Sequence, residues 1–211
     1  MKRLLALVLV LVCVLGLVGC ANKEPVENVE DTDIAVLEDA TEWFKQQTTR
    51  YEIIHGEVCN NAAIFLTGTK NPDTDSYQLL QTFVVNKNDN GYVVTAMKDC
   101  DRSFSAGISA QVLVSDGLTV VFGDTGDSVY NLENGNSIDV EFTKVNIFIE
   151  SGETKSKEIN GNAPYLLVFA GELEVSDIEF LSSELSVKYS DYYDKNLMDD
   201  TASYDVTNVF D

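Results

Sequence analysis

Four cysteines are the most reactive residues of this 211-residue chain, because a thiolate is a strong nucleophile and can also form a disulfide. Cys13 and Cys20 lie near the N-terminus, whereas Cys59 and Cys100 lie in the body of the chain. Cys20 ends the run Leu17-Val18-Gly19-Cys20, in which a small residue directly precedes the thiol. The thiol is the nucleophilic group of this run, and the glycine leaves the adjoining backbone without a bulky side chain.

The residues before Cys20 are typical of an export signal. Lys2 and Arg3 form a basic start, and the uncharged residues 4–18 follow, a stretch shorter than the roughly 20 residues of a spanning helix. In this context Leu17-Val18-Gly19-Cys20 resembles the lipobox of bacterial lipoprotein precursors. The resemblance implies that residues 1–19 are a signal peptide and that Cys20 is lipidated after cleavage. An ordinary cleaved signal and an uncleaved anchor are the alternatives.

The resemblance also implies where the mature chain resides. Lipid on Cys20 would hold it in the cell membrane, with the protein on the extracytoplasmic face, so the membrane is its first expected partner. Residues 20–33 are rich in Asp and Glu and contain Pro25, and their low apolar content predicts a disordered acidic tether.

The chain is strongly acidic, with a formal net charge of −21 at pH 7. Nucleic acids and anionic lipid surfaces are bound through Lys and Arg, so this charge excludes a nucleic-acid partner. Solubility at a crowded surface explains the charge best. An acidic binding face or a divalent-cation site is the alternative, with acidic loops at residues 73–75 and 123–127 as calcium candidates. Residues 86–91 imitate the start of an EF-hand calcium loop, but a hairpin turn explains them better.

Cys59 and Cys100 remain once Cys13 leaves with the signal and Cys20 takes the lipid. Outside the cytoplasm such a pair can be oxidised, so the sequence offers them as candidates for a disulfide. Two buried thiols are an equally good interpretation.

His55 is the single histidine, which excludes metal motifs that need two histidines and makes any Ser–His–Asp scheme depend on it. We interpret it as a packed or half-exposed strand residue. The run from Gly107 to Ser109 starts like a nucleophile elbow but lacks the closing glycine, and no glycine-rich phosphate loop precedes a helix. We therefore assign no catalytic, metal-binding or cofactor-binding residues and expect no cofactor.

The first half of the body reads as one helix followed by strands. Ile34, Leu37, Ala40 and Phe44 fall at helical spacing and predict a helix over residues 34–47 with this stripe in the core. Apolar runs separated by turn residues predict strands at 51–58, 63–69, 77–85 and 92–97. The expected unit, residues 34–101, is a helix packed on a four-stranded antiparallel sheet.

The second half contains short strand signals without helical periodicity. They fall at residues 108–115, 118–122, 140–150, 154–159, 165–170, 173–181 and 185–189, with a bulge near Ser176-Asp177. Residues 103–190 are therefore expected to form a β-sandwich-like domain, and residues 191–211 an acidic tail. The predicted fold class is α+β, mainly antiparallel β.

These patterns favour a non-catalytic, membrane-anchored surface lipoprotein that binds or scaffolds an unidentified protein or glycan. The first alternative is a carbohydrate-binding module of the cell envelope that uses exposed rings, for which Trp43, Tyr92, Tyr130 and Tyr165 are candidates. The second alternative is a hydrolase with two convergent carboxylates, whose separation the sequence does not give.

Overall fold

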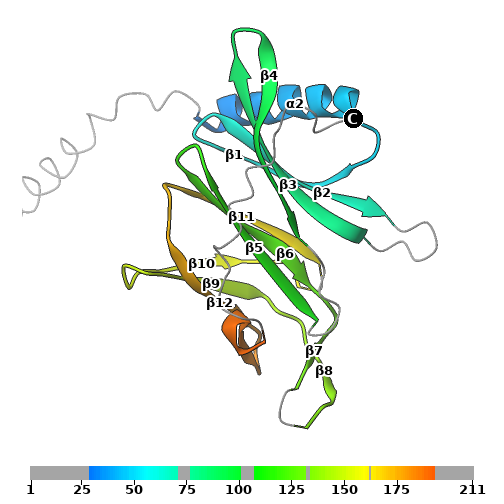
Figure 1. Ribbon diagram of the computed structural model, residues 1–211, viewed down its shortest axis with the longest axis vertical. Helices are drawn as coiled ribbons and strands as arrows, with labels where there is room; N and C mark the ends of the chain where they lie inside the picture. The colour runs from blue at the N-terminus through cyan, green and yellow to red at the C-terminus, as the bar shows by residue number, and fades with distance from the viewer. Residues whose placement is uncertain (1–28, 71–76, 101–106, 132–133, 162, 193–211) are drawn as a thin grey trace, which may run out of the picture. The chain divides into compact units, whose positions relative to one another are not determined.

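The computed structural model describes residues 29–70, 77–100, 107–131, 134–161 and 163–192 (Figure 1). The chain divides into two compact units, Met1–Asp33 and Ile34–Asp211, and the sheets described below belong to the second. Cys20, the predicted signal peptide, the calcium candidate at residues 73–75 and residues 193–211 of the predicted tail lie outside the described residues.

The helix α2 (Val29–Gln47) begins five residues before its predicted start and takes in the end of the predicted tether. Ala40 and Phe44 are buried, and Leu37 packs beside them, as the helical spacing predicts. The prediction that Ile34 joins this core is wrong, because its side chain is 56% exposed. In the part of the chain that is described, no helix is long and apolar enough to cross a membrane.

The first sheet contains four antiparallel strands in chain order, β1 (Glu52–Cys59), β2 (Ala62–Lys70), β3 (Tyr77–Asn88) and β4 (Gly91–Cys100). Helix α2 covers one face, where Phe44 meets the rings of Phe65 and Phe83 at centroid distances of 5.3 and 5.1 Å. Burial of these aromatic side chains supplies most of the attraction between helix and sheet.

A middle sheet covers the opposite face of the first. It has the order β11-β6-β5 and consists of β5 (Ile108–Ser115), β6 (Leu118–Thr125) and β11 (Pro164–Ala170). All eight residues of β6 are buried, and the apolar run Leu118–Phe122 suits a strand that is covered on both faces. Leu118, Val120 and Phe122 share a hydrophobic cluster with residues of the first sheet, such as Ile64 and Leu80.

The third sheet packs on the other face of the middle sheet through a cluster that includes Val121, Ile147 and Phe180. Its order is β10-β9-β12-β13, and its strands are β9 (Lys144–Ile149), β10 (Thr154–Glu158), β12 (Val175–Leu181) and β13 (Ser186–Lys188). The pairing of β12 with β9 shifts between Val175 and Asp177, which confirms the predicted bulge. The hairpin of β7 (Ser128–Tyr130) and β8 (Ser137–Asp139) and the short helix η1 (Tyr189–Asp191) complete the described elements.

Tight turns explain the local pairings. Asp116 and Gly117 both have positive φ, 54° and 70°, and join β5 to β6 in a two-residue mirror-type turn. Asn60 and Asn61 do the same between β1 and β2, with φ of 52° and 64°. Asparagine, aspartate and glycine tolerate the left-handed region of positive φ better than most residues, so both hairpins form without much strain.

Polar contacts also connect the two halves of the body. Lys157 Nζ lies 2.9 Å from Glu57 Oε1, linking β10 to β1, and His55 Nε2 donates to the Pro164 carbonyl across 2.9 Å. The predicted boundary near residues 101–103 lies outside the described residues, and the two predicted domains stay a prediction. The described sheets confirm the predicted fold class, with one helix on a four-stranded antiparallel sheet followed by further antiparallel sheets.

Candidate functional site

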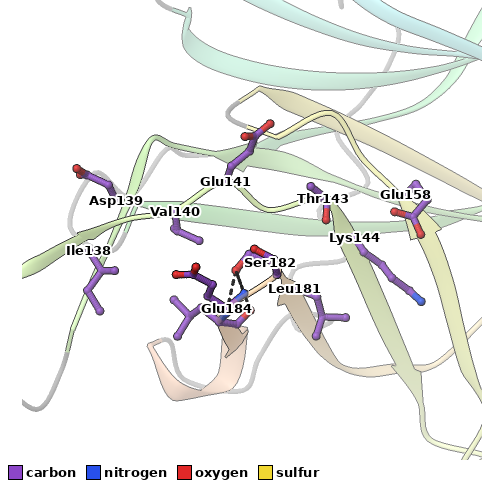
Figure 2. A pocket seen from close by; sticks show the side chains of 12 residues that line it. Ile138, Asp139, Val140, Glu141, Thr143, Lys144, Glu158, Leu181, Ser182 and Glu184 are labelled. Atoms are coloured by element: carbon purple, nitrogen blue, oxygen red, sulfur yellow. Dashed lines mark hydrogen bonds between the residues drawn. The ribbon is translucent and has the colours of Figure 1, made fainter.

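A cleft of about 600 Å³ opens beside the third sheet (Figure 2). It lies between β8, the segment that connects β8 to β9, the end of β12 and the turn that follows it. Twelve residues line it: Ile138, Asp139, Val140, Glu141, Thr143, Lys144, Glu158, Leu181, Ser182, Ser183, Glu184 and Leu185.

One wall exists because residues 140–143 leave strand geometry. The sequence predicts a strand over 140–150, but β9 begins only at Lys144. The Val140 amide donates to the Asp127 carbonyl and the Thr143 amide to the Leu181 carbonyl, so this segment is held at both ends. Phe142, between them, is fully buried against the ring of Phe180. Phe142 therefore anchors this wall in the core, while the side chains of Val140, Glu141 and Thr143 line the cleft.

The facing wall is the turn from Ser182 to Leu185. The Ser182 hydroxyl oxygen accepts hydrogen bonds from the amides of Glu184 and Leu185, at 3.2 and 2.9 Å. The Ser182 amide also donates to the Leu185 carbonyl across 2.8 Å. A serine that bonds the backbone two and three residues ahead fixes a turn, so Glu184 and Leu185 have defined positions.

The lining combines apolar and acidic side chains. Val140, Leu181 and Leu185 are half-buried, and Ile138 on β8 is 36% exposed. Four exposed carboxylates and the ammonium of the half-buried residue Lys144 supply its charge; the carboxylates are Asp139, Glu141, Glu158 and Glu184. Such a cleft can bury apolar groups while attracting positive charge at its rim.

These carboxylates do not form an enclosed pair. Glu158 stands opposite Lys144 in the pairing of β10 with β9. In Figure 2, Glu158 lies at one end of the cleft, apart from Glu184, and the Glu141 carboxylate points away from Glu184. Because all four are exposed, water screens their charges, and the arrangement suits recognition better than proton transfer.

His55 lies on β1 at a second cavity of about 170 Å³, which Glu57, Pro164 and Tyr165 also line and which shares Glu158 with the cleft. It is a strand residue, as the sequence predicts, and its ring is exposed. Ser109 and Asp124 pair in register on β5 and β6 but do not line this cavity. Ser109 is only 4% exposed, and its hydroxyl oxygen accepts the Asp124 amide. The structure therefore does not assemble a Ser–His–Asp site from these residues.

The calcium candidates have structural roles in the described part of the chain. Residues 86–91 contain the β3–β4 turn, where the Asn90 amide donates to Asn88 Oδ1 across 2.8 Å. Asp124 and Thr125, within the candidate at residues 123–127, lie in buried β6. Among the described residues, no three or more His, Cys, Asp or Glu side chains are grouped to hold a metal ion.

Cys59 and Cys100 occupy opposite ends of the first sheet. Cys59 pairs with Ala62, whereas Cys100 pairs with Leu80, which in turn pairs with Gly68. Cys59 therefore lies level with Ala62 and Cys100 level with Gly68, six residues or roughly 20 Å further along β2. A disulfide needs Cα atoms within about 7 Å of each other. This arrangement contradicts the Cys59–Cys100 disulfide that the sequence offered. A sequence gives the number of residues between two cysteines. It does not give the strand register, which here places the two cysteines far apart.

The four aromatic candidates for glycan binding do not form one platform. Tyr165 is buried, and its hydroxyl donates to the Ser109 carbonyl across 2.9 Å. Burial raises the Tyr165 pKa well above 10.0, with further contributions from the nearby Cys100, Tyr189 and Asp124. Trp43 and Tyr92 pack with the helix-facing cluster, whereas Tyr130 is exposed on the β7–β8 hairpin.

Comparison of the chain with protein-family models, with curated proteins and with solved structures finds no match.

Sequence reasoning singled out none of the cleft residues, because they come from strand ends, an irregular segment and a turn. The run Ser182-Ser183-Glu184, which interrupts two apolar stretches, was the available signal of a fixed turn.

Proposed function

We propose that this chain is a non-catalytic surface lipoprotein, anchored in the cell membrane through lipid on Cys20, that binds a partner protein in the cleft beside the third sheet. The observation that carries the binding role is the cleft itself, in which Ile138, Val140 and Leu185 stand between two walls held by backbone hydrogen bonds. Its size lies in the range of pockets that bind ligands, about 300–1,000 Å³.

The polar groups of the cleft support binding rather than catalysis. Hydrolysis by paired carboxylates needs one acid with a raised pKa, which enzymes obtain by burial or by a close like charge. Glu141, Glu158 and Glu184 are exposed, and His55 lines a different cavity, which it shares with Glu158 but not with Glu141 or Glu184. These positions weigh against the hydrolase alternative.

A protein partner suits the cleft better than a glycan. Sugar rings are commonly bound by stacking on aromatic side chains, and none of the twelve lining residues is aromatic. Of the rings considered for this role, Tyr165 is part of the core and Tyr130 stands on the β7–β8 hairpin. The apolar lining instead matches the side chains that anchor protein segments in grooves.

The anchor follows from the lipobox resemblance of residues 17–20. Lipid at Cys20 would keep the cleft close to the outer surface of the membrane and raise its effective concentration toward partners there. The protein would act by holding a partner at that surface.

Site-specific photo-crosslinking in intact cells tests this proposal. A photoreactive residue replaces Ile138 in the cleft or, as a control, Val93 on β4, whose exposed fraction is nearly the same, 36% against 38%. We expect a discrete protein adduct from position 138 and none from position 93. No adduct at 138, or the same adducts from both positions, would exclude the cleft as the binding site.

A further inference from the structure

We infer that the cleft takes a basic, amphipathic segment of another protein, in which Lys or Arg residues alternate with apolar ones. This inference rests on the proposed binding function and specifies its ligand. Two properties of the lining point to it, apolar side chains on both of its sides and acidic side chains at its rim.

The apolar side chains of the cleft favour a ligand that also carries apolar groups. Ile138 is one of four large hydrophobic residues that are exposed in the described part of the chain, and it borders Val140 within the cleft (Figure 2). Leu181 and Leu185 on the facing wall are half-buried, so apolar surface lies on both sides. A ligand side chain that enters between them removes both surfaces from water, which favours binding.

The rim requires positive charge on the ligand. Asp139, Glu141 and Glu184 are exposed around the part of the cleft away from Glu158 (Figure 2). Lys144 is the cation among the twelve lining residues, and its register partner is Glu158. The four carboxylates outnumber this one lysine, so a ligand with ammonium or guanidinium groups would complement the lining, whereas an acidic ligand would be repelled.

Net charge also distinguishes among the molecules that could occupy the cleft. A second copy of this chain carries a net charge of −21 and would be repelled from an acidic rim. The chain's own terminal segments are acidic as well, since residues 193–211 contain five Asp and one Lys and residues 20–33 are rich in Asp and Glu. A separate basic protein is therefore the occupant that fits.

Peptide binding to the full chain in non-ionic detergent tests this inference. Three labelled peptides of equal length serve as probes, with alternating leucine–lysine, leucine–glutamate and serine–lysine sequences. We expect the leucine–lysine peptide to bind most tightly, the serine–lysine peptide more weakly and the leucine–glutamate peptide not at all, as fluorescence anisotropy would report. Raising the salt concentration should weaken the leucine–lysine complex, because salt screens exposed charges.

Paired variants locate the binding. The double variant Glu141→Gln/Glu184→Gln should weaken leucine–lysine binding about fivefold, the loss expected for two exposed ion pairs. The matched variant Glu172→Gln/Glu174→Gln, which removes two exposed carboxylates outside the cleft, should leave affinity unchanged. Ile138→Ser should also weaken binding about fivefold, whereas Val93→Ser should not.

Several results would overturn the inference. These are equal affinity for the three peptides, no binding of the leucine–lysine peptide, or equal losses in the cleft and control variants. If adducts at position 138 still form in cells, the binding cleft stands and only its ligand class is refuted. If those adducts are also absent, the proposed function fails together with the inference.

Discussion

Lys98 Nζ donates a hydrogen bond to the Val112 carbonyl across 3.0 Å and thereby joins β4 of the first sheet to β5 of the middle sheet. The lysine is 7% exposed, so its ammonium is held between two sheets rather than in water. Burial of a charge is costly unless polar groups replace its hydration, and this carbonyl is one such group. The contact connects the half of the body that precedes residues 101–106 with the half that follows.

Replacing Lys98 by methionine should therefore destabilise the protein although the new side chain is apolar and similar in length. We expect Lys98→Met to lower the free energy of unfolding by about 1.5–3 kcal/mol, the contribution of a buried hydrogen bond to a charged group. Lys45→Met, at an exposed position of the last turn of α2, should change it by less than about 0.5 kcal/mol. Urea unfolding measures both, and equal effects would contradict a special role for Lys98.

Tyr165 should make stability fall at high pH. Because burial raises its folded-state pKa above the unfolded value of 10.0, the folded protein keeps a proton that the unfolded chain loses. Its contribution is therefore complete below about pH 10 and declines above it, by up to about 1.4 kcal/mol per pH unit.

Comparison with Tyr165→Phe isolates this effect. The variant should lose about 1 kcal/mol at pH 8, because the Ser109 carbonyl loses the hydroxyl that donates to it. Between pH 10 and 11, its unfolding free energy should fall less steeply than that of the wild type. Tyr130→Phe, at an exposed position, serves as the control. Parallel pH profiles for wild type and Tyr165→Phe would refute the prediction.

Gly68 on β2 should tolerate no side chain. A Cβ atom there would lie 2.9 Å from Tyr77 Cγ, closer than real Cβ contacts, and 3.0 Å from Ile54 Cδ1, which is also tight. We expect Gly68→Ala to cost about 1–3 kcal/mol of unfolding free energy through overpacking. In a Tyr77→Ala background the same substitution should cost much less, because the ring is absent. An undiminished cost in the double variant would show that the strain arises elsewhere.

Local patterns determine most of what could be predicted of this fold. The spacing of Leu37, Ala40 and Phe44 locates the helix core, and the turn Asp116-Gly117 locates a hairpin. The pairing of β6 with β11 and of β9 with β12 is harder to predict from the sequence. The paired strands are far apart along the chain, and no turn specifies which strands pair. The continuous apolar run of β6 nevertheless carried a signal that both of its faces are covered.

The cleft was less predictable than the fold. Val140 and Phe142 alternate with polar residues, so a pattern-based prediction extends the strand through the cleft wall, although they are out of phase with the buried residues of β9, which starts at Lys144. The chain leaves strand geometry there because the fully buried Phe142 is packed against Phe180, a contact between distant parts of the sequence. Ser182 and Glu184 likewise become a wall only through the turn that the serine stabilises.

Anchoring through Cys20 can be separated from folding. Cys20→Ser removes the thiol that the lipobox resemblance implicates, while the body from Ile34 onward keeps its sequence. We expect the variant to leave the membrane fraction or to accumulate as uncleaved precursor, because no lipid can be added to serine. Cys59→Ser should stay in the membrane fraction, and equal distribution of the two variants would argue against a lipid on Cys20.

The most direct test of a lipid-anchored binding protein is the mass of its N-terminal peptide. The full chain is expressed in a bacterium, extracted from the membrane with detergent, digested and measured by mass spectrometry. We predict a peptide that begins at Cys20 and carries the added mass of a diacylglyceryl group. A chain that begins at any other residue, or an unmodified Cys20 thiol, would contradict the account.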